Sequence, residues 1–520
     1  MAENPVCRII LQPSHTELTA KRGTPLREIL FEQGVEFPCG GQGRCRGCRI
    51  RVLHGDAKVN PAENDILGAV EISQGWRLAC QCAIESDLEI ELRQWDAVIL
   101  ADESQFAFRP RKGLGVAVDL GTTTLVAQLL DLQTGRVLAV KTALNAQARH
   151  GADVMSRIHF AVLEHCQHRL QELIREQIGG LIQQLIAVSG KSGAEIRDIV
   201  IVGNTVMHHL FCGVDAGPLS HYPFESPRMG LEEFRAHDLG WKLAGDPTVH
   251  FLPCLGGFVG SDVLAGILAT KLHESDEMIG LVDLGTNGEI VIGNRESMLC
   301  ASTAAGPAFE GAKISMGMRA CTGAISEVNI LPDNVHGKDH GQLQCGVLGN
   351  VAPQGLCGSG LVDAVAAGLE LDVITPSGRF STRTDSWTLS PPVAITQNDV
   401  RELQLAKAAI AAGIQILSDK MGASNLSRIY LAGAFGNYIN RASARRIGLI
   451  DFPPERTKPA GNTALLGAKM ALFNLECGHA AYTALRQRIH HVVLNRDPSF
   501  QDVFVEQLAF PQAASVSNLH

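Results

Sequence analysis

Four cysteines near the N-terminus have the type and spacing to bind iron. They lie in the stretches PCGGQGRCRGC and RLACQ, and they are Cys39, Cys45, Cys48 and Cys80. Iron–sulfur clusters are held by cysteine thiolates, and a 2Fe–2S cluster commonly takes three from one loop and the fourth from a distant position. Zinc sites usually pair two short cysteine hooks, whereas this region has only one. The spacing therefore favours a 2Fe–2S cluster over a zinc site or unrelated buried thiols.

The residues around these cysteines resemble a ferredoxin of the adrenodoxin-like and related bacterial type, whose first cysteine gap is one residue longer than the plant-type gap. Glycines let such a loop turn sharply and aim backbone N–H groups at the sulfurs; here they are Gly40, Gly41, Gly43 and Gly47. Cys82 could compete with Cys80 as the fourth ligand. Residues 77–81 match the ferredoxin signature R-L-x-C-Q, so we expect Cys80 to be the ligand.

A second pattern, which occurs twice, could bind phosphate. An apolar run ends in aspartate followed by Gly-Thr, at Asp119 in VAVDLGTTTL and at Asp283 in GLVDLGTNGEI. In such a hairpin the turn N–H groups and the threonine hydroxyl face phosphate oxygens, while the carboxylate holds Mg²⁺, often through water. Two facing turns could grip the β- and γ-phosphates of ATP, because phosphoryl transfer needs little beyond positioning and charge neutralisation. There is no Walker A sequence, so the predicted site is not a P-loop.

The elements that must position the cysteines form a small N-terminal domain, predicted over residues 1–96. A strand at 7–11, a short helix at 25–33 and a closing strand at 88–92 follow the order of a β-grasp ferredoxin. Residues 97–112 carry mixed charge without a clear period, and we expect them to be a linker.

The elements that must position the two aspartates are themselves repeated. Each strand–turn–strand unit is followed by an amphipathic helix and then by a strand ending in glycine, first in IVIVGNTVMHHL and later in RIYLAGAFGNYI. The repeat predicts two related α/β lobes, a middle domain at 113–275 and a C-terminal domain at 276–520, with a ligand cleft between them.

These motifs resemble the superfamily of actin, sugar and acetate kinases and the seventy-kilodalton chaperones. Residues 118–124 match its phosphate-1 motif, 282–289 its phosphate-2 motif and 431–436 its adenosine motif. The implied fold class is a multidomain α+β and α/β protein, in which an N-terminal β-grasp 2Fe–2S ferredoxin precedes a duplicated actin-like (RNase H-like) ATPase.

The same resemblance implies roles for individual residues. Asp119 and Asp283 would organise Mg²⁺, and a separate hypothesis lets Glu289 or Glu310 position the attacking water. The residues that would contact the phosphates of ATP are Gly121, Thr122, Thr123, Gly285, Thr286 and Asn287. The residues that would let the nucleotide lie against the backbone are Gly433, Ala434 and Gly436.

The domain order, ferredoxin then linker then duplicated ATPase, resembles the reductive activators of corrinoid proteins. Further family-like stretches are AQARHGADVMSRI, GNTVMHHL, AAGPAFEGA and GLCGSGLVDAV. The resemblance implies ATP-dependent electron transfer from the 2Fe–2S cluster to an inactive Co(II) corrinoid, which restores Co(I) for methyl transfer. It also implies a corrinoid (cobalamin-binding) protein of a methyltransferase system as partner, an external low-potential electron donor, and a homodimer.

Two other functions remain open at this stage. One is a redox-regulated metabolite kinase of the same superfamily, which would need an acceptor pocket and a base near the γ-phosphate; no dedicated base is evident. The other is a nucleotide-gated electron-transfer ferredoxin, which would reduce no cobalt.

Three smaller motifs each have a functional and a structural interpretation. His208 and His209 could approach cobalt, but adjacent histidines after a strand are more often structural. Residues 355–360, GLCGSG, could bind phosphate at a helix start or could serve close packing. Asp153 and Arg157, four residues apart, could form an intrahelical ion pair.

Composition excludes several classes of protein. The net charge of −9 leaves no basic footprint for nucleic acid, and no apolar run of ~18 residues predicts a membrane span. Four of the 14 cysteines belong to the predicted cluster and the rest are scattered, and the N-terminus lacks an export signal, so we expect a reduced, cytoplasmic protein. Arginines at 44, 46, 49 and 51 are either a solvated face or a docking surface for an acidic electron donor.

The choice of fourth ligand can be tested directly. We expect Cys80→Ser to abolish the visible absorption of the 2Fe–2S cluster, because it removes a thiolate ligand. Cys82→Ser, the matched control, should keep that absorption in anaerobically purified protein. Loss of the spectrum in the Cys82 variant alone would show that the assignment is wrong.

Overall fold

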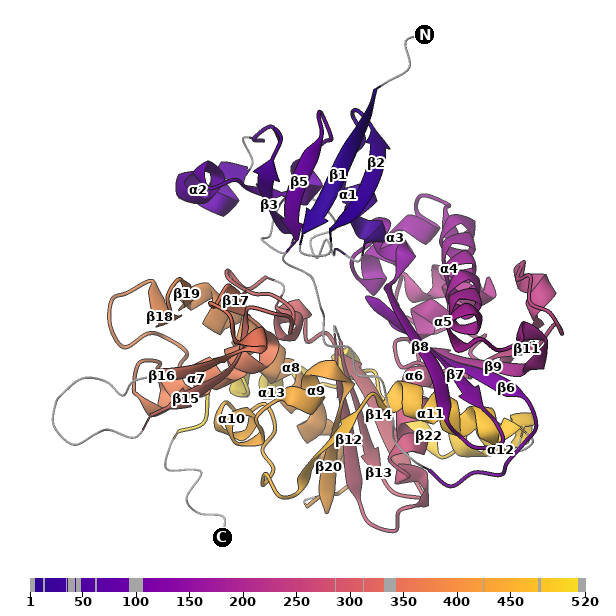
Figure 1. Cartoon of the computed structure of the whole chain (residues 1–520). Coiled ribbons are helices and arrows are strands. Elements are labelled where there is room, and N and C mark those ends of the chain that lie inside the picture. The colour runs from indigo at the N-terminus through magenta and orange to yellow at the C-terminus, as the bar shows by residue number, and fades with distance from the viewer. Residues whose placement is uncertain are drawn as a thin grey trace. The chain divides into compact units, whose positions relative to one another are not determined.

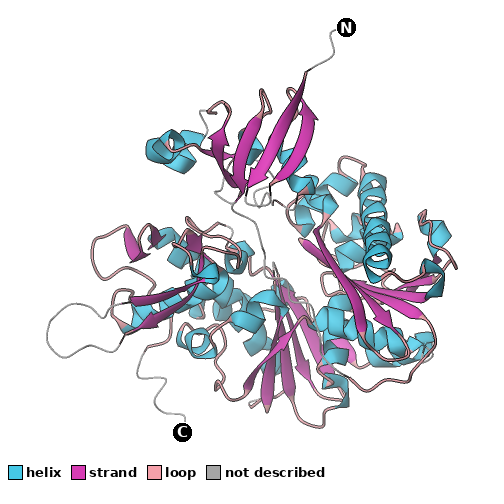
Figure 2. Cartoon of the chain, in the orientation of Figure 1, coloured by secondary structure: helices cyan, strands magenta, loops and turns pink. Residues whose placement is uncertain are grey.

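The computed structural model describes residues 5–12, 15–33, 35, 43, 48–60, 63–92, 106–285, 287–311, 313–331, 343–423, 425–475 and 478–512 (Figures 1 and 2). The chain forms two compact units. One comprises Met1–Val98 with Pro307–Leu403, and the other Ile99–Gly306 with Gln404–His520. The domain boundaries drawn from the sequence stay predictions.

In the first unit, the N-terminal residues form a five-stranded sheet in the order β2-β1-β5-β3-β4. Only β1 and β5 pair in parallel, while the other neighbours are antiparallel. Leu26 and Leu30 of helix α1 are fully buried against this sheet. The predicted β-grasp order is confirmed, with these bounds: β1 Val6–Gln12, β2 Thr16–Lys21, α1 Leu26–Glu32, β3 Arg49–His54, α2 Asn64–Ser73, β4 Trp76–Leu78 and β5 Leu88–Leu92.

The later part of the first unit is built around helix α7 (Gly358–Glu370), which packs on β15 (Ala324–Ile330). A Cβ atom on Gly358 would lie 2.0 Å from the Phe309 carbonyl oxygen, and one on Gly360 would lie 2.2 Å from that of Ile325. The glycines at the start of α7 therefore serve close packing. The remaining strands are β16 Leu343–Val347, β17 Gly355–Leu356, β18 Ser386–Ser390 and β19 Val393–Thr396.

The second unit contains two six-stranded sheets whose cores repeat each other. Their strand orders are β10-β11-β9-β6-β7-β8 and β21-β20-β12-β13-β14-β22. In both, the aspartate-bearing strand pairs in parallel with a later strand and antiparallel with its hairpin partner. The predicted duplication is confirmed. The bounds are β6 Leu114–Leu120, β7 Thr124–Asp131, β8 Val137–Leu144, β9 Ile196–Gly203, β10 Glu232–Arg235, β11 Thr248–Phe251, β12 Ile279–Leu284, β13 Gly288–Gly293, β14 Met298–Thr303, β20 Arg428–Ala432, β21 Thr457–Gly461 and β22 Ile489–His491.

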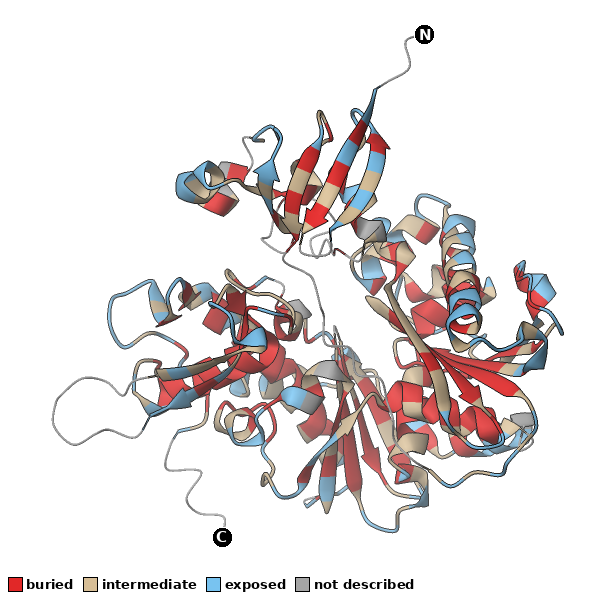
Figure 3. Cartoon of the chain, viewed as in Figure 1, coloured by how far each residue is buried: buried red, intermediate tan, exposed pale blue. Residues whose placement is uncertain are grey.

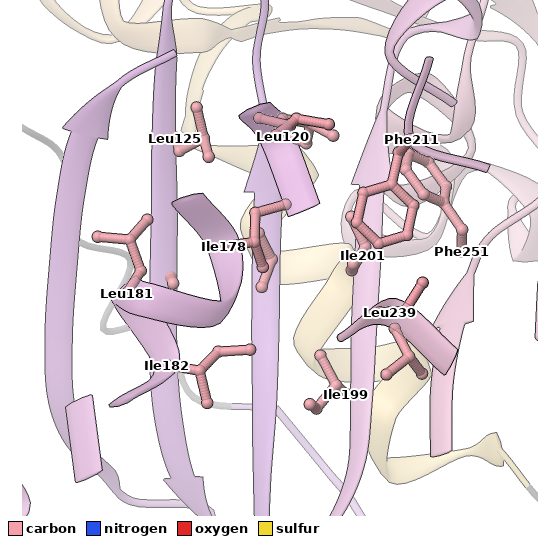
Figure 4. Packing of buried hydrophobic residues seen from close by; sticks show 14 of the residues in the cluster. Leu120, Leu125, Ile178, Leu181, Ile182, Ile199, Ile201, Phe211, Leu239 and Phe251 are labelled. Carbon is pink, nitrogen blue, oxygen red and sulfur yellow. The ribbon is translucent and has the colours of Figure 1, made fainter. Parts of the chain in front are cut away.

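The core of the first lobe lies between its sheet and helix α4 (Gln167–Ser189). The predicted apolar stripe of α4 is buried at Leu170, Ile174, Ile178, Leu181, Ile182 and Leu185. Figure 4 shows three of these side chains among those of the strands, and Figure 3 shows the central strands as mostly buried. Burying a leucine or isoleucine contributes about 1.5–3 kcal/mol, so this stripe fixes the helix on the sheet.

Helices α6 (Ser261–Ala269) and α11 (Thr463–Phe473) pack closely against each other. A Cβ atom on Gly467 of α11 would lie only 2.0 Å from the Ala265 carbonyl oxygen of α6. Helix α11 follows β21 of the second sheet, yet it contacts β6 and β9 of the first. It therefore ties the two lobes together.

The other helices complete the fold. They are α3 Val154–Val162, α5 Thr205–Cys212, α8 Gln397–Lys420, α9 Gly433–Tyr438, α10 Arg441–Arg446, α12 Gly478–Arg486 and α13 Phe500–Glu506. Among the residues that the structure describes, we find no helix with the length and apolar character needed to cross a membrane.

The close approach of α6 and α11 predicts a large effect of a single methyl group. Gly467→Ala should lower the free energy of unfolding by about 1–3 kcal/mol, because the methyl group must displace the α6 backbone. Gly180→Ala in α4, where nothing lies within 4 Å of the new Cβ atom, should instead raise it by about 0.5–1 kcal/mol. Urea unfolding followed by circular dichroism would compare the two, and equal effects would contradict the packing described.

Candidate nucleotide and cluster sites

Two of the predicted cluster ligands lie on neighbouring segments at the edge of the N-terminal sheet. Cys48 immediately precedes β3, and Cys80 lies in the short helix η2 (Ala79–Gln81) after β4. The Ala79 N–H donates a 3.0 Å hydrogen bond to the Cys48 carbonyl oxygen, which holds the two segments together. Cys39 and Cys45 lie outside the described residues.

Gln81 forms part of the wall around Cys80. Its side-chain nitrogen lies 3.5 Å from the Cys80 sulfur, and its oxygen accepts a 3.1 Å hydrogen bond from Asn60. Gly43 has a φ of +67°, a conformation that favours glycine, and a Cβ atom there would lie 2.8 Å from the Gln81 side-chain nitrogen and push it aside. The Asn60 backbone N–H donates to buried Glu63 at 2.9 Å. This hydrogen-bonded chain holds an amide N–H toward a ligand sulfur, which suits an iron–sulfur cluster.

Cys82 faces a different environment. Its side chain is buried, and its sulfur donates toward the Leu78 carbonyl oxygen at 3.4 Å. Cys80 is partly exposed. This difference agrees with the choice of Cys80, which stays a prediction.

The two lobes place Asp119 and Asp283 at equivalent positions, each one residue before the end of its strand. Their cross-strand neighbours differ. Asp119 pairs with Val126 on β7, whereas Asp283 pairs with Glu289 on β13. Directly opposed residues on an antiparallel pair have neighbouring side chains, so the second lobe carries a carboxylate pair where the first has a single carboxylate.

Four partly buried carboxyl groups lie near enough for their charges to act at this site. Burial raises the pKa of Asp119 to about 6. Burial, and then the negative charge of Asp119, raises the pKa of Asp283 to about 7. Asp262 has a pKa of about 7 from burial and from both aspartates, and the pKa of Glu289 lies well above its ordinary value for similar reasons. A divalent cation such as Mg²⁺ would offset this negative charge. Among the described residues no three acidic, histidine or cysteine side chains converge on one ion, so the carboxylates would hold Mg²⁺ partly through water.

The sequence analysis did not identify Asp262. It lies in the first turn of α6, within the segment GGFVGSDVLAG. An acidic residue in a first helical turn is ordinary, so the sequence carries no specific signal for it. Only the packing of α6 brings it close enough for the charges of Asp119 and Asp283 to raise its pKa.

The phosphate-1 turn, residues 121–124, is held by hydrogen bonds from the first lobe. A Cβ atom on Gly121 would lie 2.6 Å from the Thr124 carbonyl oxygen, so the turn requires glycine. The Asn145 backbone N–H donates to the Thr123 carbonyl oxygen at 2.8 Å, and its side chain donates to that of Gly121 at 2.9 Å. The turn is therefore fixed without a ligand.

Arg157 also holds the phosphate-1 turn in place. Its guanidinium is fully buried and donates to the carbonyl oxygens of Thr122 and Gly151. The suggested intrahelical pair with Asp153 is not formed, because Asp153 instead caps α3 by accepting from the Ser156 N–H at 2.8 Å. Burial lowers the pKa of Arg157 to about 9. Because this value is above neutral pH, Arg157 keeps its positive charge next to the phosphate-1 turn.

The second lobe supplies a similar turn and the predicted adenosine segment. The Gly285 N–H donates to the Asn287 carbonyl oxygen at 3.1 Å, while Thr286 lies outside the described residues. Gly433 begins α9, the helix that also contains Ala434 and Gly436. A Cβ atom on Gly433 would lie 2.7 Å from the Asp283 carboxylate, so only glycine lets β20 and α9 pass this close.

Three other candidates from the sequence are Glu310, His208 and His209. Glu310 belongs to the first unit, in η8 (Pro307–Glu310). His208 and His209 are fully buried on α5, and burial lowers their pKa values to about 3 and 4. His208 bonds the Gly230 carbonyl oxygen at 3.2 Å and His209 that of Thr205 at 2.8 Å, which fits a structural role.

The chain combines two parts. One is a β-grasp sheet with two of the predicted cluster cysteines beside it, and the other is a duplicated α/β unit with an aspartate near the end of a strand in each lobe. These two parts define the class of the protein. It is a 2Fe–2S protein fused to an actin-like ATPase.

Comparison with known proteins narrows this class. Three family models match in succession: a 2Fe–2S iron–sulfur cluster binding domain over residues 9–85, the RACo middle region over 114–275, and the C-terminal ASKHA domain of RACo over 277–519. The chain is 36% identical over 429 residues to the corrinoid activation enzyme RamQ of Eubacterium limosum, a match that covers 76% of this chain and 70% of that protein.

A second relative and a solved structure are also described as proteins that act on corrinoid proteins. A [Co(II) methylated amine-specific corrinoid protein] reductase from Methanosarcina barkeri is 26% identical over 428 residues, covering 76% of this chain and 77% of that protein. A solved structure described as a reductive activator for corrinoid, iron-sulfur protein aligns over 97% of this chain and 98% of its own, with 27% identity and a TM-score of 0.68. The chain belongs to the RACo family of reductive activators of corrinoid proteins, with a 2Fe–2S cluster, ATP and Mg²⁺ as its cofactors.

The contact between Gln81 and Cys80 predicts a shift in the cluster's reduction potential. Hydrogen bonds to cluster sulfurs stabilise the reduced, more negative state, so Gln81→Leu should lower the potential. Potentiometric titration followed by electron paramagnetic resonance would measure it. Gln12→Leu is the matched control, since Gln12 bonds Glu89 elsewhere in the same sheet and should leave the potential unchanged. An unaltered potential in the Gln81 variant would contradict the assigned contact.

Proposed function

We propose that this chain passes an electron from a 2Fe–2S cluster, held by Cys39, Cys45, Cys48 and Cys80, to an inactive Co(II) corrinoid protein. ATP hydrolysis at the site that contains Asp119, Asp262, Asp283 and Glu289 makes this electron transfer possible. The transferred electron restores Co(I) for methyl transfer. The observation that carries the proposal is the pairing, in one chain of the RACo family, of a cluster domain with a duplicated phosphate site. The names of both curated relatives, an activation enzyme and a reductase of corrinoid proteins, support it.

Different residues of the second unit would bind Mg²⁺ and the phosphates of ATP. Mg²⁺, when bound, neutralises charge on the phosphates. Asp119 and Asp283 would hold the ion from opposite lobes, with Asp262 completing the negative surroundings. The phosphate-1 turn presents its N–H groups and the Thr122 and Thr123 hydroxyls to phosphate oxygens, and Arg157 adds positive charge beneath it.

In the second lobe, Glu289 is the proposed acceptor for the proton of the attacking water. It lies directly across from Asp283 and accepts a 3.4 Å hydrogen bond from Ser302, which orients its carboxyl group. Gly285 and Asn287 would contact the phosphates from this lobe, together with Thr286 as predicted from the sequence. Gly433, Ala434 and Gly436 line the backbone against which the nucleotide lies.

Coupling between hydrolysis and electron transfer follows from differential binding. Co(I) has a very low potential, so the transfer is uphill unless ATP favours one conformation of the protein over another. Helix α11 is the proposed mechanical link, because it leaves β21 of one lobe and packs on β6 and β9 of the other.

Partners follow from the same chemistry. The acceptor is a corrinoid protein of a methyltransferase system. An external low-potential donor must re-reduce the cluster after each transfer, and exposed Arg51 on β3 offers a cation to an acidic donor. A homodimer rests on family resemblance. A cytoplasmic location is proposed from the scattered cysteines outside the cluster pattern, which the reducing cytosol would keep as thiols.

The proposal is tested by following Co(I) absorbance when anaerobically reduced protein meets a Co(II) corrinoid protein with and without MgATP. The wild-type chain should form Co(I) faster with MgATP. Asp283→Asn should lose roughly a hundredfold of the ATP-stimulated rate while keeping its cluster spectrum, because it weakens the hold on the Mg²⁺ that would stabilise transition-state charge by several kcal/mol.

The control is Asp246→Asn, which alters a surface carboxylate paired with Arg235 and His237 and should leave the rate unchanged. Absence of ATP-stimulated Co(I) in the wild-type chain would overturn the proposed function. Phosphorylation of a small metabolite instead would favour a kinase.

A further inference from the structure

The tripeptide Gly-Asn-Thr begins two different helices of the second unit. One is Gly203-Asn204-Thr205 at the end of β9, and the other is Gly461-Asn462-Thr463 at the end of β21. In both, the asparagine caps the helix through its side-chain oxygen. Asn204 accepts from the Met207 N–H at 3.0 Å, and Asn462 accepts from the Leu465 N–H at 2.8 Å. Capping uses only the oxygen, so each side-chain NH₂ group is left to donate elsewhere.

Both NH₂ groups donate to the phosphate-1 strand and turn, but to different groups. The Asn204 nitrogen donates to the Thr122 hydroxyl oxygen at 2.8 Å. The Asn462 nitrogen donates to Oδ2 of Asp119 at 2.9 Å. The first bond lies within one lobe, whereas the second crosses from the end of β21 in the second lobe to β6 in the first.

We propose that the two asparagines are positioning residues with divided roles, Asn462 orienting the Asp119 carboxylate for Mg²⁺ and Asn204 orienting the Thr122 hydroxyl for phosphate. This inference rests on the proposed nucleotide site.

The hydrogen-bond directions explain the division. A hydroxyl that accepts a bond from Asn204 has its own hydrogen left to donate, and an anionic phosphate oxygen is the complementary acceptor. A carboxylate bonded through Oδ2 is held in one orientation and keeps Oδ1 for a cation. Because Asn462 caps α11, any movement of α11 against the first lobe also moves the donor that orients Asp119.

The test uses serine, which caps helices about as well as asparagine but has no NH₂ group. Binding of a fluorescent ATP analogue to the full chain would be titrated anaerobically, first in EDTA and then with increasing Mg²⁺. Asn462→Ser should raise the Mg²⁺ concentration at half-effect about tenfold and leave metal-free binding unchanged, since it removes one bond to a charged group. Asn204→Ser should weaken metal-free binding several-fold and leave the Mg²⁺ half-effect in place.

Controls separate this inference from stability and from the proposed site. Asn294→Ser alters an asparagine in the β13–β14 turn that accepts from the Glu296 and Ser297 N–H groups, and it should change neither quantity. Equal changes of both quantities in the Asn462 and Asn204 variants, or no change in either, would overturn the divided roles. Failure of the wild-type chain to bind the analogue at any Mg²⁺ concentration would instead remove the proposed nucleotide site.

Discussion

Repulsion among four partly buried carboxyl groups is the main electrostatic constraint on the proposed site of the second unit. Asp119, Asp262, Asp283 and Glu289 come from three strands and one helix, and the charges of neighbouring members raise the pKa values of Asp262, Asp283 and Glu289. Like charges held close together are costly unless a cation or protons neutralise them. The fold can hold them there because the strands and helices around them are fixed by apolar packing, such as the α4 stripe and the close α6–α11 contact. In the proposed function, Mg²⁺ bound with the nucleotide would offset this cost, which would link nucleotide binding to conformation at the site.

The duplication explains why two lobes can act on one ligand, and the departures from it give each lobe its own role. Both sheets place an aspartate one residue before a strand ends, followed by a tight turn. The first lobe adds a buried cation, Arg157, beneath its turn, while the second adds Glu289 opposite its aspartate. In the proposed mechanism the first lobe favours phosphate binding and the second lobe accepts a proton. Helix α11, with Asn462 at its start, connects the two.

In the cluster domain, backbone hydrogen bonds determine where the predicted ligands Cys48 and Cys80 lie. Adjacent segments before β3 and after β4 bring Cys48 and Cys80 together through a backbone hydrogen bond. The Glu63–Asn60–Gln81 chain then supports the wall beside the Cys80 sulfur. A rigid, hydrogen-bonded surround keeps a cluster's potential defined, which is what an electron carrier requires.

The sequence alone determined the features that local spacing encodes: the cysteine pattern, the two Asp-x-Gly-Thr turns, the strands and amphipathic helices, and hence the fold class. Periodicity and turn chemistry act over a few residues, so they can be read directly. The tertiary structure decided what depends on distant packing. Asp262 joins the carboxylate cluster only because of where α6 packs. Arg157 bonds the Thr122 carbonyl oxygen and not Asp153. Asn462 bonds Asp119, although the two residues are 343 positions apart in the chain. A hydrogen bond needs its two atoms within about 3 Å, and no local pattern records which distant residue the fold will bring that close.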